Sequence, residues 1–395
     1  MGWMIAKEKL DETQRNILSG MTGQNHNLFI HGPAGSGKSV VLVHALQDYL
    51  LNKPTSRLAI ISYTLALIDL YKTGIESELL KRVDFFTMEG FKKITISNRW
   101  DFFIIDEIQD SEIEVLDKLK QSGKKIITAG DFFQSIYENR CNISGIKELE
   151  NLQEPELPVI YRNTKSIKAI AVLFAEFPDE YSAFEVSRTA NDTSVQLAHF
   201  SSKLKESEYT WKQAKMLSEK GINSVIIFAN HNEVLSFYSN VFELENKNPW
   251  VLVKNSFNHP HYEALNIYSQ RMNLPIRYLG NGYGSLQKIY NENFVTVMTY
   301  HSAKGMDFGA VFLPSLTNQV DLWRNNPDIA RRLFFVALTR SRQELYISYY
   351  GEPHEFIQRI PKNLLHTTND PKTFSVNSGT NHNDVPFDDD DDVAF

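Results

Sequence analysis

One eight-residue segment constrains the fold of this chain more than any other feature. Residues 32–39 read Gly-Pro-Ala-Gly-Ser-Gly-Lys-Ser, a complete G-x-x-x-x-G-K-[ST] pattern. The apolar run 28–30 precedes this segment, and the helix-like run 40–50 follows it. A strand, a glycine-rich loop and a helix in this order predict a phosphate-binding loop in an α/β domain.

The residue types in the loop suit a nucleoside triphosphate. Glycines let successive backbone N–H groups turn toward the phosphates at a helix N-terminus. Lys38 is expected to reach the β- and γ-phosphate oxygens, and the Ser39 hydroxyl to bind Mg²⁺. The expected cofactors are therefore ATP and Mg²⁺, and the expected nucleotide-binding residues are Gly32, Pro33, Ala34, Gly35, Ser36, Gly37, Lys38 and Ser39.

A pair of carboxylates follows a second apolar run. Residues 102–105 lead directly into Asp106-Glu107-Ile108-Gln109-Asp110. Asp106, at the end of this predicted strand, is placed to hold Mg²⁺ through water, and Glu107 can take a proton from the attacking water. A carboxylate base beside a phosphate loop predicts hydrolysis of ATP rather than binding alone.

Composition and charge narrow the class of protein. The 395 residues are 42% hydrophobic and 23% charged, as in soluble proteins of two or three domains. The single cysteine, Cys141, is expected to be a buried apolar thiol. The first residues, 1–11, lack the apolar core of a signal peptide, so a cytoplasmic location is expected.

The net charge of −7 at first argues against a nucleic-acid partner. Asp384 and residues 388–392, however, place six aspartates in the last twelve residues, so the rest of the chain carries −1. A nearly neutral body can still present a basic groove, because binding depends on local charge.

Further motifs follow in a recognisable order. They are Gln14 in Leu10–Arg15, Gln134 in Ala129–Tyr137, the run Ile160–Asn163, the run Thr299–Phe308, and the run Arg331–Arg340. Together with the phosphate loop and Asp106-Glu107, they resemble the Q motif and motifs III to VI of the superfamily 1 helicases of the UvrD/Rep/PcrA type. The resemblance extends over roughly residues 10–350.

The resemblance implies roles for individual residues. It implies adenine contacts from Gln14 and Tyr161, a backbone contact from Gly305, a γ-phosphate sensor in Gln134, and guanidinium groups on the γ-phosphate from Arg162 and Arg340. Both arginines belong to the second predicted domain, whereas Lys38 belongs to the first. ATP is therefore expected to bind between two domains.

The pattern of apolar runs fits two tandem RecA-like α/β domains with parallel sheets. The expected strands are 28–31, 58–62, 83–86, 102–106 and 126–129 in the first domain, and 195–200, 225–229, 294–299, 310–313 and 345–349 in the second. The predicted domains are 1–155 and 156–365, with a small insert near 246–277, followed by a disordered acidic tail at 366–395.

Large inserted subdomains, which family members that unwind DNA well carry, are not expected here. Asp106 follows Lys38 by only 68 residues, and His301 follows Arg162 by 139. The core strands and helices of the two domains take up most of both intervals. The chain is therefore expected to be close to a bare motor.

The resemblance also implies a track for single-stranded DNA, with bases stacked on aromatic rings and phosphates held by hydroxyl and backbone groups. The candidate contacts are Tyr63, Thr64, Phe86, Thr87, Tyr137, Thr299 and His301. The family has a tryptophan two residues after the position of Tyr137. This chain has Asn139 there, so one stacking contact is missing from the pattern.

The tail ends in five aspartates followed by Val-Ala-Phe395. It resembles the acidic tip of bacterial single-stranded DNA-binding proteins, which suggests a docking peptide for a protein partner. A solubilising tail that shields the DNA groove is the alternative, and the sequence leaves both open.

Three functions follow, in order of preference. The first is an ATP- and Mg²⁺-dependent translocase or helicase on single-stranded DNA or a tailed duplex, moving 3′ to 5′ as the family subset implies. The second is a DNA-stimulated ATPase subunit that regulates a partner nuclease in a bacterial defence or repair complex. The third is a nucleotide-binding scaffold without turnover, against which Glu107 and Arg340 argue.

Overall fold

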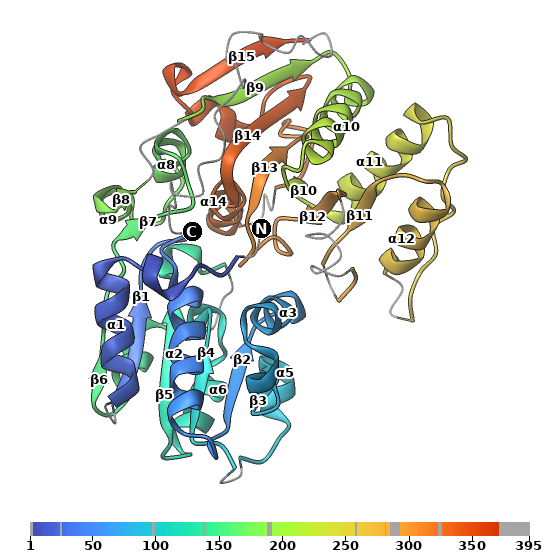
Figure 1. Cartoon of the computed structure of the whole chain (residues 1–395). Helices are drawn as coiled ribbons and strands as arrows, with labels where there is room; N and C mark the ends of the chain where they lie inside the picture. The colour runs from blue at the N-terminus through green and yellow to red at the C-terminus, as the bar shows by residue number, and fades with distance from the viewer. Residues whose placement is uncertain are drawn as a thin grey trace. The chain divides into compact units, whose positions relative to one another are not determined.

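The computed structural model describes residues 3–23, 26–96, 99–136, 140–187, 192–256, 259–280, 282–284, 293–322 and 326–370, which group into two compact units (Figure 1). The first unit contains the described residues up to Arg162 together with 176–187. The second contains 163–175 and the described residues from 192 onward. The division therefore falls after Arg162 rather than at the predicted position 155, and a short segment returns to the first unit.

The first unit is built on a six-stranded parallel sheet with the order β3-β2-β4-β5-β1-β6. Its strands are β1 (Asn27–His31), β2 (Leu58–Ser62), β3 (Val83–Thr87), β4 (Phe102–Ile105), β5 (Lys125–Gly130) and β6 (Leu152–Gln153). Its helices are α1 (Glu12–Gly23), α2 (Lys38–Asn52), α3 (Leu65–Gly74), α4 (Ser77–Leu80), α5 (Met88–Lys92), α6 (Ile113–Lys120), α7 (Ile143–Lys147) and α9 (Pro178–Ala183). The 3₁₀ turns η1 (Lys7–Lys9), η2 (Ile108–Asp110) and η3 (Phe132–Gln134) and the short pair β7 (Val159–Ile160) and β8 (Glu185–Val186) complete it.

The central strands of this sheet are apolar at nearly every position because helices cover both faces. In β1, Leu28 and Ile30 belong to the core cluster that contains α1 and α2, whereas Phe29 belongs to the cluster that contains α5 and α6. Strand β4 is buried along its whole length. Parallel sheets covered on both faces have this continuous hydrophobic pattern. The predicted parallel α/β fold is therefore confirmed in the first unit.

The second unit contains a seven-stranded parallel sheet with the order β11-β12-β10-β13-β14-β9-β15. Its strands are β9 (Val195–Phe200), β10 (Ser224–Phe228), β11 (Ile276–Tyr278), β12 (Val295–Thr299), β13 (Phe308–Leu313), β14 (Ser341–Tyr350) and β15 (Leu365–Asn369). Its helices are α8 (Lys165–Val172), α10 (Lys203–Glu219), α11 (His231–Leu244), α12 (Tyr262–Arg271), α14 (Pro327–Leu338) and α15 (Glu355–Arg359), with the 3₁₀ turn η4 (Lys362–Leu364).

Two segments of the second unit differ from the sequence prediction. The stretch expected to form a small insert contains α12 and most of β11, and the α12 side chains Tyr262 and Leu265 are fully buried in the core of the unit. The tail was expected to begin at residue 366, but residues 365–369 form β15, which pairs in parallel with β9. The acidic residues beyond 370 lie outside the described part of the chain.

One smaller prediction concerns the single cysteine. Cys141 is buried, and its burial raises the pKa of the thiol to about 11, as expected for a structural cysteine. Within the described residues, no helix combines the length and the apolar character needed to cross a membrane.

Candidate nucleotide-binding site

The phosphate loop of the first unit connects β1 to α2, as predicted. Gly35 and Gly37 have φ values of 77° and 85°, a left-handed conformation that glycine adopts at little cost. Gly37 caps the 15-residue helix α2, whose N-terminus is suited to bind anions. The buried Lys38 amine donates hydrogen bonds to the carbonyl oxygens of Gly32 (2.8 Å) and Pro33 (2.9 Å). The lysine is thus folded back along the loop.

Several predicted nucleotide contacts pack against this loop. Gln14 is fully buried, and its Nε2 donates to the carbonyl oxygen of Ser36 at 3.2 Å. The backbone N–H of Tyr161 donates to the carbonyl oxygen of Gly35 at 2.9 Å. A Cβ atom added to Gly35 would overlap the Arg162 side chain, so glycine is needed there for steric reasons too.

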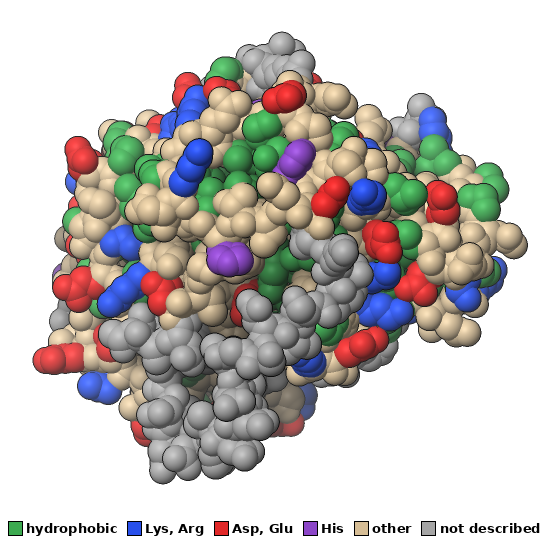
Figure 2. All heavy atoms as spheres, turned by 90° about the horizontal axis from the view of Figure 1, so that it is seen from above, with side chains coloured by type: hydrophobic (Ala, Val, Ile, Leu, Met, Phe, Trp, Pro, Cys, Tyr) green, Lys and Arg blue, Asp and Glu red, His purple; other side chains and the backbone are tan. Residues whose placement is uncertain are grey.

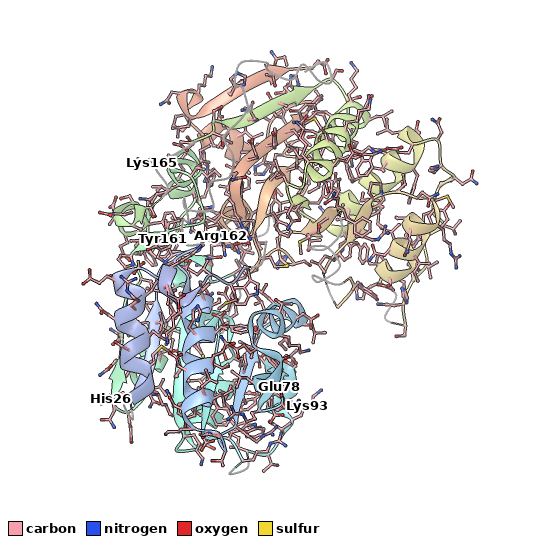
Figure 3. All side chains as sticks on the ribbon, in the orientation of Figure 1. His26, Glu78, Lys93, Tyr161, Arg162 and Lys165 are labelled. Carbon is pink, nitrogen blue, oxygen red and sulfur yellow. The ribbon has the colours of Figure 1, made fainter. Side chains whose placement is uncertain are left out.

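Figure 3 shows Tyr161 and Arg162 next to each other in the first unit, to which both belong. The sequence had placed them in the second predicted domain, 156–365. The Tyr161 hydroxyl donates to the Asp11 carboxylate, and burial followed by this interaction raises the pKa of the phenol. The residue after them, Asn163, belongs to the second unit, where its amide donates to the carbonyl oxygens of Thr339 (3.3 Å) and Ser341 (2.7 Å).

The Asp106 carboxylate lies beside the phosphate loop at the carboxyl edge of the sheet. Its Oδ2 accepts hydrogen bonds from the Ser39 hydroxyl (2.7 Å) and from the Tyr71 hydroxyl (2.7 Å), and its Oδ1 accepts from the Glu107 N–H (2.9 Å). Burial, and then the neighbouring Glu107 charge, raise the pKa of Asp106. A cation bound beside this buried carboxylate would lower its pKa and so oppose both effects.

The oxygen atoms of Ser39 and Asp106 fit Mg²⁺, which proteins bind through one or two side-chain oxygens together with water and substrate phosphates. Within the described residues there is no group of three or more His, Cys, Asp or Glu side chains that could hold a metal by itself.

Glu107 has a strained backbone. Its φ of 55° and ψ of 48° are left-handed, a conformation that costs a residue with a side chain on the order of 1–3 kcal/mol. Gln109 Nε2 donates to Glu107 Oε2 at 2.5 Å, while Gln109 Oε1 accepts from the Asp131 N–H at 3.1 Å. One amide side chain thus holds the candidate base and joins the end of β4 to the end of β5.

Gln134 lies at the end of the same edge, in η3. Its Nε2 donates to the buried Asp131 carboxylate at 2.5 Å, and Asp131 also accepts from the Phe133 N–H at 3.0 Å. Burial raises the pKa of Asp131, and the Lys38 charge opposes this rise. The predicted γ-phosphate sensor therefore belongs to the same network of polar groups as Glu107.

The second unit holds the remaining predicted nucleotide contacts. The Arg340 guanidinium is 1% exposed and donates to the carbonyl oxygens of Val336 (2.9 Å) and Met306 (3.0 Å) and to the Thr339 hydroxyl (3.1 Å). Gly305 has a φ of 79° in the loop between β12 and β13. These hydrogen bonds hold Arg340 between the last turn of α14 and the loop that contains Met306.

The candidate nucleic-acid contacts of the first unit differ in what their side chains bind or pack against. Thr64 and Thr87 cap the N-termini of α3 and α5 by accepting from Leu67 N–H (3.1 Å) and Gly90 N–H (3.0 Å). The Phe86 ring packs edge-on against two other aromatic rings, those of Phe91 and Trp100. The half-buried ring of Tyr63 lies 6.0 Å from the Arg140 guanidinium, and Tyr137 is outside the described residues.

Two candidates from the second unit lie at the end of β12. The Thr299 hydroxyl donates to the Ser302 hydroxyl at 3.0 Å and accepts from the Ser302 N–H. Burial, followed by the charges of His231 and Lys304, lowers the pKa of His301 to about 4. His301 is therefore neutral at pH 7, and any nucleic-acid contact it makes would be a hydrogen bond or a stacking contact.

Sequence reasoning named neither Tyr71 nor Asp131 as a functional residue, and it gave Gln109 no role. The bridge through Gln109 becomes visible only when β4 and β5 are known to be neighbours. For Tyr71 the sequence offers no signal, since the residue occupies an ordinary apolar position in a helix.

Two family models match the chain. Residues 28–208 match the viral superfamily 1 RNA helicase core domain, and residues 282–352 match the UvrD-like helicase C-terminal domain. The first match contains the phosphate loop, Asp106-Glu107 and Arg162, and the second contains Thr299, Gly305 and Arg340.

Similar proteins with assigned names are ATP-dependent DNA helicases. The ATP-dependent DNA helicase UvrD1 of Mycobacterium leprae is 26% identical over 258 residues, which are 58% of this chain and 30% of that protein. The ATP-dependent DNA helicase PcrA of Staphylococcus aureus is 36% identical over 93 residues, which are 19% of this chain and 13% of that protein. The chain thus spans less than a third of the length of these relatives.

Among solved structures, one of Pif1 helicases studied for DNA unwinding at forked double-stranded DNA has a TM-score of 0.45 and 13% identity, covering 90% of this chain and 94% of that one. This structural likeness is too weak to indicate a shared function. The identification rests instead on the two family models and the named relatives. By these matches the chain belongs to the superfamily 1 helicases of the UvrD/Rep/PcrA type.

Proposed function

We propose that this chain is an ATP- and Mg²⁺-dependent translocase or helicase that acts on single-stranded DNA. The observation that carries the proposal is the 2.7 Å hydrogen bond from Ser39 to Asp106. It brings together the phosphate loop and the carboxylate pair, which lie 67 residues apart in the sequence. Binding alone requires the loop, whereas hydrolysis requires the carboxylates as well.

In the proposed mechanism, each residue of the first unit has a defined task. The Lys38 ammonium has three N–H donors, two of which bond to loop carbonyls here, and it exchanges these partners for phosphate oxygens when ATP binds. Ser39 and Asp106 would hold Mg²⁺, which neutralises charge on the β- and γ-phosphates. Glu107, oriented by Gln109, accepts the proton of the attacking water.

Two arginines are proposed to act on the transferring phosphoryl group. Arg162 packs on Gly35 of the phosphate loop, and Arg340 is anchored in the second unit by Val336 and Met306. We propose that ATP binds between the units, so that Arg340 reaches the γ-phosphate only when they close. Closure and opening during each turnover would then move the chain along DNA.

Single-stranded DNA is the proposed substrate because the named relatives are DNA helicases and the candidate contacts are hydroxyl and aromatic groups. On the face shown in Figure 2, Lys and Arg side chains are interspersed with Asp and Glu. Binding is therefore proposed to depend on local contacts such as those of Tyr63, Thr64, Thr299 and His301. The family resemblance supports movement 3′ to 5′.

One observation favours a second candidate, a DNA-stimulated ATPase subunit that regulates a partner nuclease. The described residues between Lys38 and Asp106 form only the sheet strands and the helices α2 to α5. A motor without an added subdomain there has less surface with which to separate two strands. A protein partner that docks the acidic tail would suit this role, although the tail lies outside the described residues.

Strand separation distinguishes the two candidates. A helicase should unwind a duplex with a 3′ single-stranded tail in the presence of ATP and Mg²⁺, and should leave a duplex with a 5′ tail intact. Hydrolysis stimulated by single-stranded DNA without any unwinding would favour the regulatory subunit. Unwinding of only the 5′-tailed duplex would contradict the proposed direction.

A further inference from the structure

The Tyr71 hydroxyl makes a contact that the proposed mechanism does not explain. It donates to Asp106 Oδ2 at 2.7 Å, the same oxygen that accepts from Ser39. Tyr71 is 1% exposed and Asp106 is 2% exposed, so water does not compete freely for this bond. A hydrogen bond between a neutral donor and a buried carboxylate is stronger than one between two neutral groups.

The ring of Tyr71 is held firmly in place. Trp3 packs edge-on against it with ring centroids 6.2 Å apart, and the Trp3 indole N–H donates to the Leu70 carbonyl (3.1 Å) and the Thr73 hydroxyl (3.0 Å). Gly74 permits this packing, because an added Cβ atom would lie 2.5 Å from the Trp3 ring. Tyr71 therefore moves with α3 as a body rather than by rotation of its side chain.

Helix α3 begins at the candidate nucleic-acid contacts of the first unit. Thr64 is its N-cap, and Tyr63 precedes that residue directly. Strand β2, which leads into these two residues, is the neighbour of β4, and the Asp106 N–H donates to the Ile61 carbonyl oxygen at 3.3 Å. The N-terminus of α3 and the Asp106 carboxylate are thus connected twice, once through β2 and once through Tyr71.

From these contacts we infer that Tyr71 is a positioning residue, which ties α3 to Asp106 so that nucleic-acid binding at Tyr63 and Thr64 and Mg²⁺–nucleotide binding strengthen each other. A shift of α3 on DNA binding carries the Tyr71 hydroxyl with it and reorients the carboxylate that faces Ser39. Because linkage is reciprocal, DNA strengthens Mg²⁺–nucleotide binding by the same factor by which Mg²⁺–nucleotide strengthens DNA binding. The inference rests on the proposed function of the site.

The test is a binding measurement on the full chain with the variant Tyr71→Phe, which keeps the ring and its packing on Trp3. A fluorescent ADP is titrated in EDTA and again in Mg²⁺, each with and without single-stranded DNA of mixed sequence. Tyr71→Phe should bind ADP as the wild type does in EDTA and about tenfold more weakly in Mg²⁺, the scale of one lost hydrogen bond to a charged group. The strengthening by DNA should disappear.

The matched control is Tyr49→Phe, which removes a hydroxyl from a tyrosine of the same unit whose ring packs on Phe102 at 4.5 Å. It should match the wild type in all four titrations. Unchanged Mg²⁺ and DNA dependence in Tyr71→Phe would overturn the inference and leave the proposed function intact. Weaker ADP binding in EDTA, with a lower unfolding temperature, would show a purely structural role and overturn it too. A failure of the proposed function appears instead in the wild type, as an absence of Mg²⁺–nucleotide binding.

Discussion

The loop after β1 in the first unit and the loop after β12 in the second both contain a buried lysine, but they lead into different elements. In the first, the loop after β1 ends in Gly37-Lys38 and opens into the 15-residue helix α2. In the second, the loop after β12 spans residues 300–307, contains Lys304 and Gly305, and leads into β13 without a helix. Both lysines are buried, at 8% and 3% exposed. Only the first lies at a helix N-terminus, where backbone N–H groups and the helix dipole favour phosphate.

The first unit also carries the further groups that the proposed hydrolysis requires. The first unit adds a carboxylate pair at the end of β4 and a bridge through Gln109 to the end of β5. The carboxyl edge of the second unit offers Thr299 and His301 instead, at the end of β12, whereas Arg340 directly precedes β14 and is held to the loop between β12 and β13. We therefore expect the first unit to hold the nucleotide and the reacting groups. We expect the second unit to supply the Arg340 guanidinium and part of the DNA contact.

The largest effect is expected at Arg340, which tests whether the second unit contributes to the chemistry. Arg340→Ala should lower the turnover number about 10³-fold with little change in ATP affinity, the scale of a lost arginine finger. Arg340→Lys should recover little, since lysine lacks the planar fork of donors. Steady-state hydrolysis and nucleotide binding measure the two parameters, and unfolding temperatures check the fold. Full ATPase activity in Arg340→Ala would show that Arg340 has only a structural role.

A somewhat smaller effect is expected at the candidate base. Glu107→Gln keeps the shape of the side chain and its place near Gln109 but cannot accept the proton, so turnover should fall at least about 100-fold while ATP binding persists. Single-turnover hydrolysis measures the chemical step directly. A variant that hydrolyses ATP at nearly the normal rate would show that another group activates the water.

Matched substitutions of Lys38 and Lys304 compare how much each loop contributes to ATP affinity. Lys38→Met should weaken ATP binding about 30-fold, because a charged hydrogen bond to phosphate is lost. Lys304→Met, which removes an equally buried charge from the other unit, should change ATP affinity less than about threefold. Isothermal titration of both variants gives the comparison. Equal losses would mean that the second loop also contacts phosphate.

The smallest effect concerns the stability of the second unit. Glu206 of α10 is buried and accepts from the Ser315 N–H (2.9 Å) and the Ser348 hydroxyl (2.7 Å), and burial raises its pKa to about 7. The native state thus holds a proton that the unfolded state releases near pH 4.5, so this group lowers stability as pH rises from about 4.5 to 7.

Glu206→Gln, which cannot ionise, should flatten that pH dependence, with hydrogen exchange in β14 as the local measure. The raised pKa corresponds to on the order of 3 kcal/mol at most. Exchange in β1 of the first unit serves as the control and should not change. An equal pH slope in wild type and variant would show that Glu206 stays ionised in the native state.

Much of this architecture could be predicted from the sequence, because local patterns determine it. Strand β2 and strand β9 have the predicted limits, since each is an apolar run bounded by polar residues. Strand β15 was missed because Leu-His-Thr-Thr-Asn has little apolar character and forms a strand only by pairing with β9. Long-range pairing of this kind leaves no periodic signal in the sequence.

The candidate site shows the same limit. The phosphate loop and Asp106-Glu107 were predictable because their spacing is short and chemically specific. The contacts of Gln109 with Asp131 and of Tyr71 with Asp106 depend on which strands and helices are neighbours. The position of Arg162 beside Gly35 was not foreseen, because its place in the chain suggested the other unit.

The central claim is that this site hydrolyses ATP in response to nucleic acid, and the most direct measurement is the steady-state ATPase rate of the full chain with and without single-stranded DNA of mixed sequence. We expect Mg²⁺-dependent hydrolysis that rises when DNA is added, and binding to DNA that weakens steeply as salt is raised. Tight nucleotide binding with no hydrolysis, whether DNA, RNA or neither is present, would contradict it and leave only a nucleotide-binding scaffold.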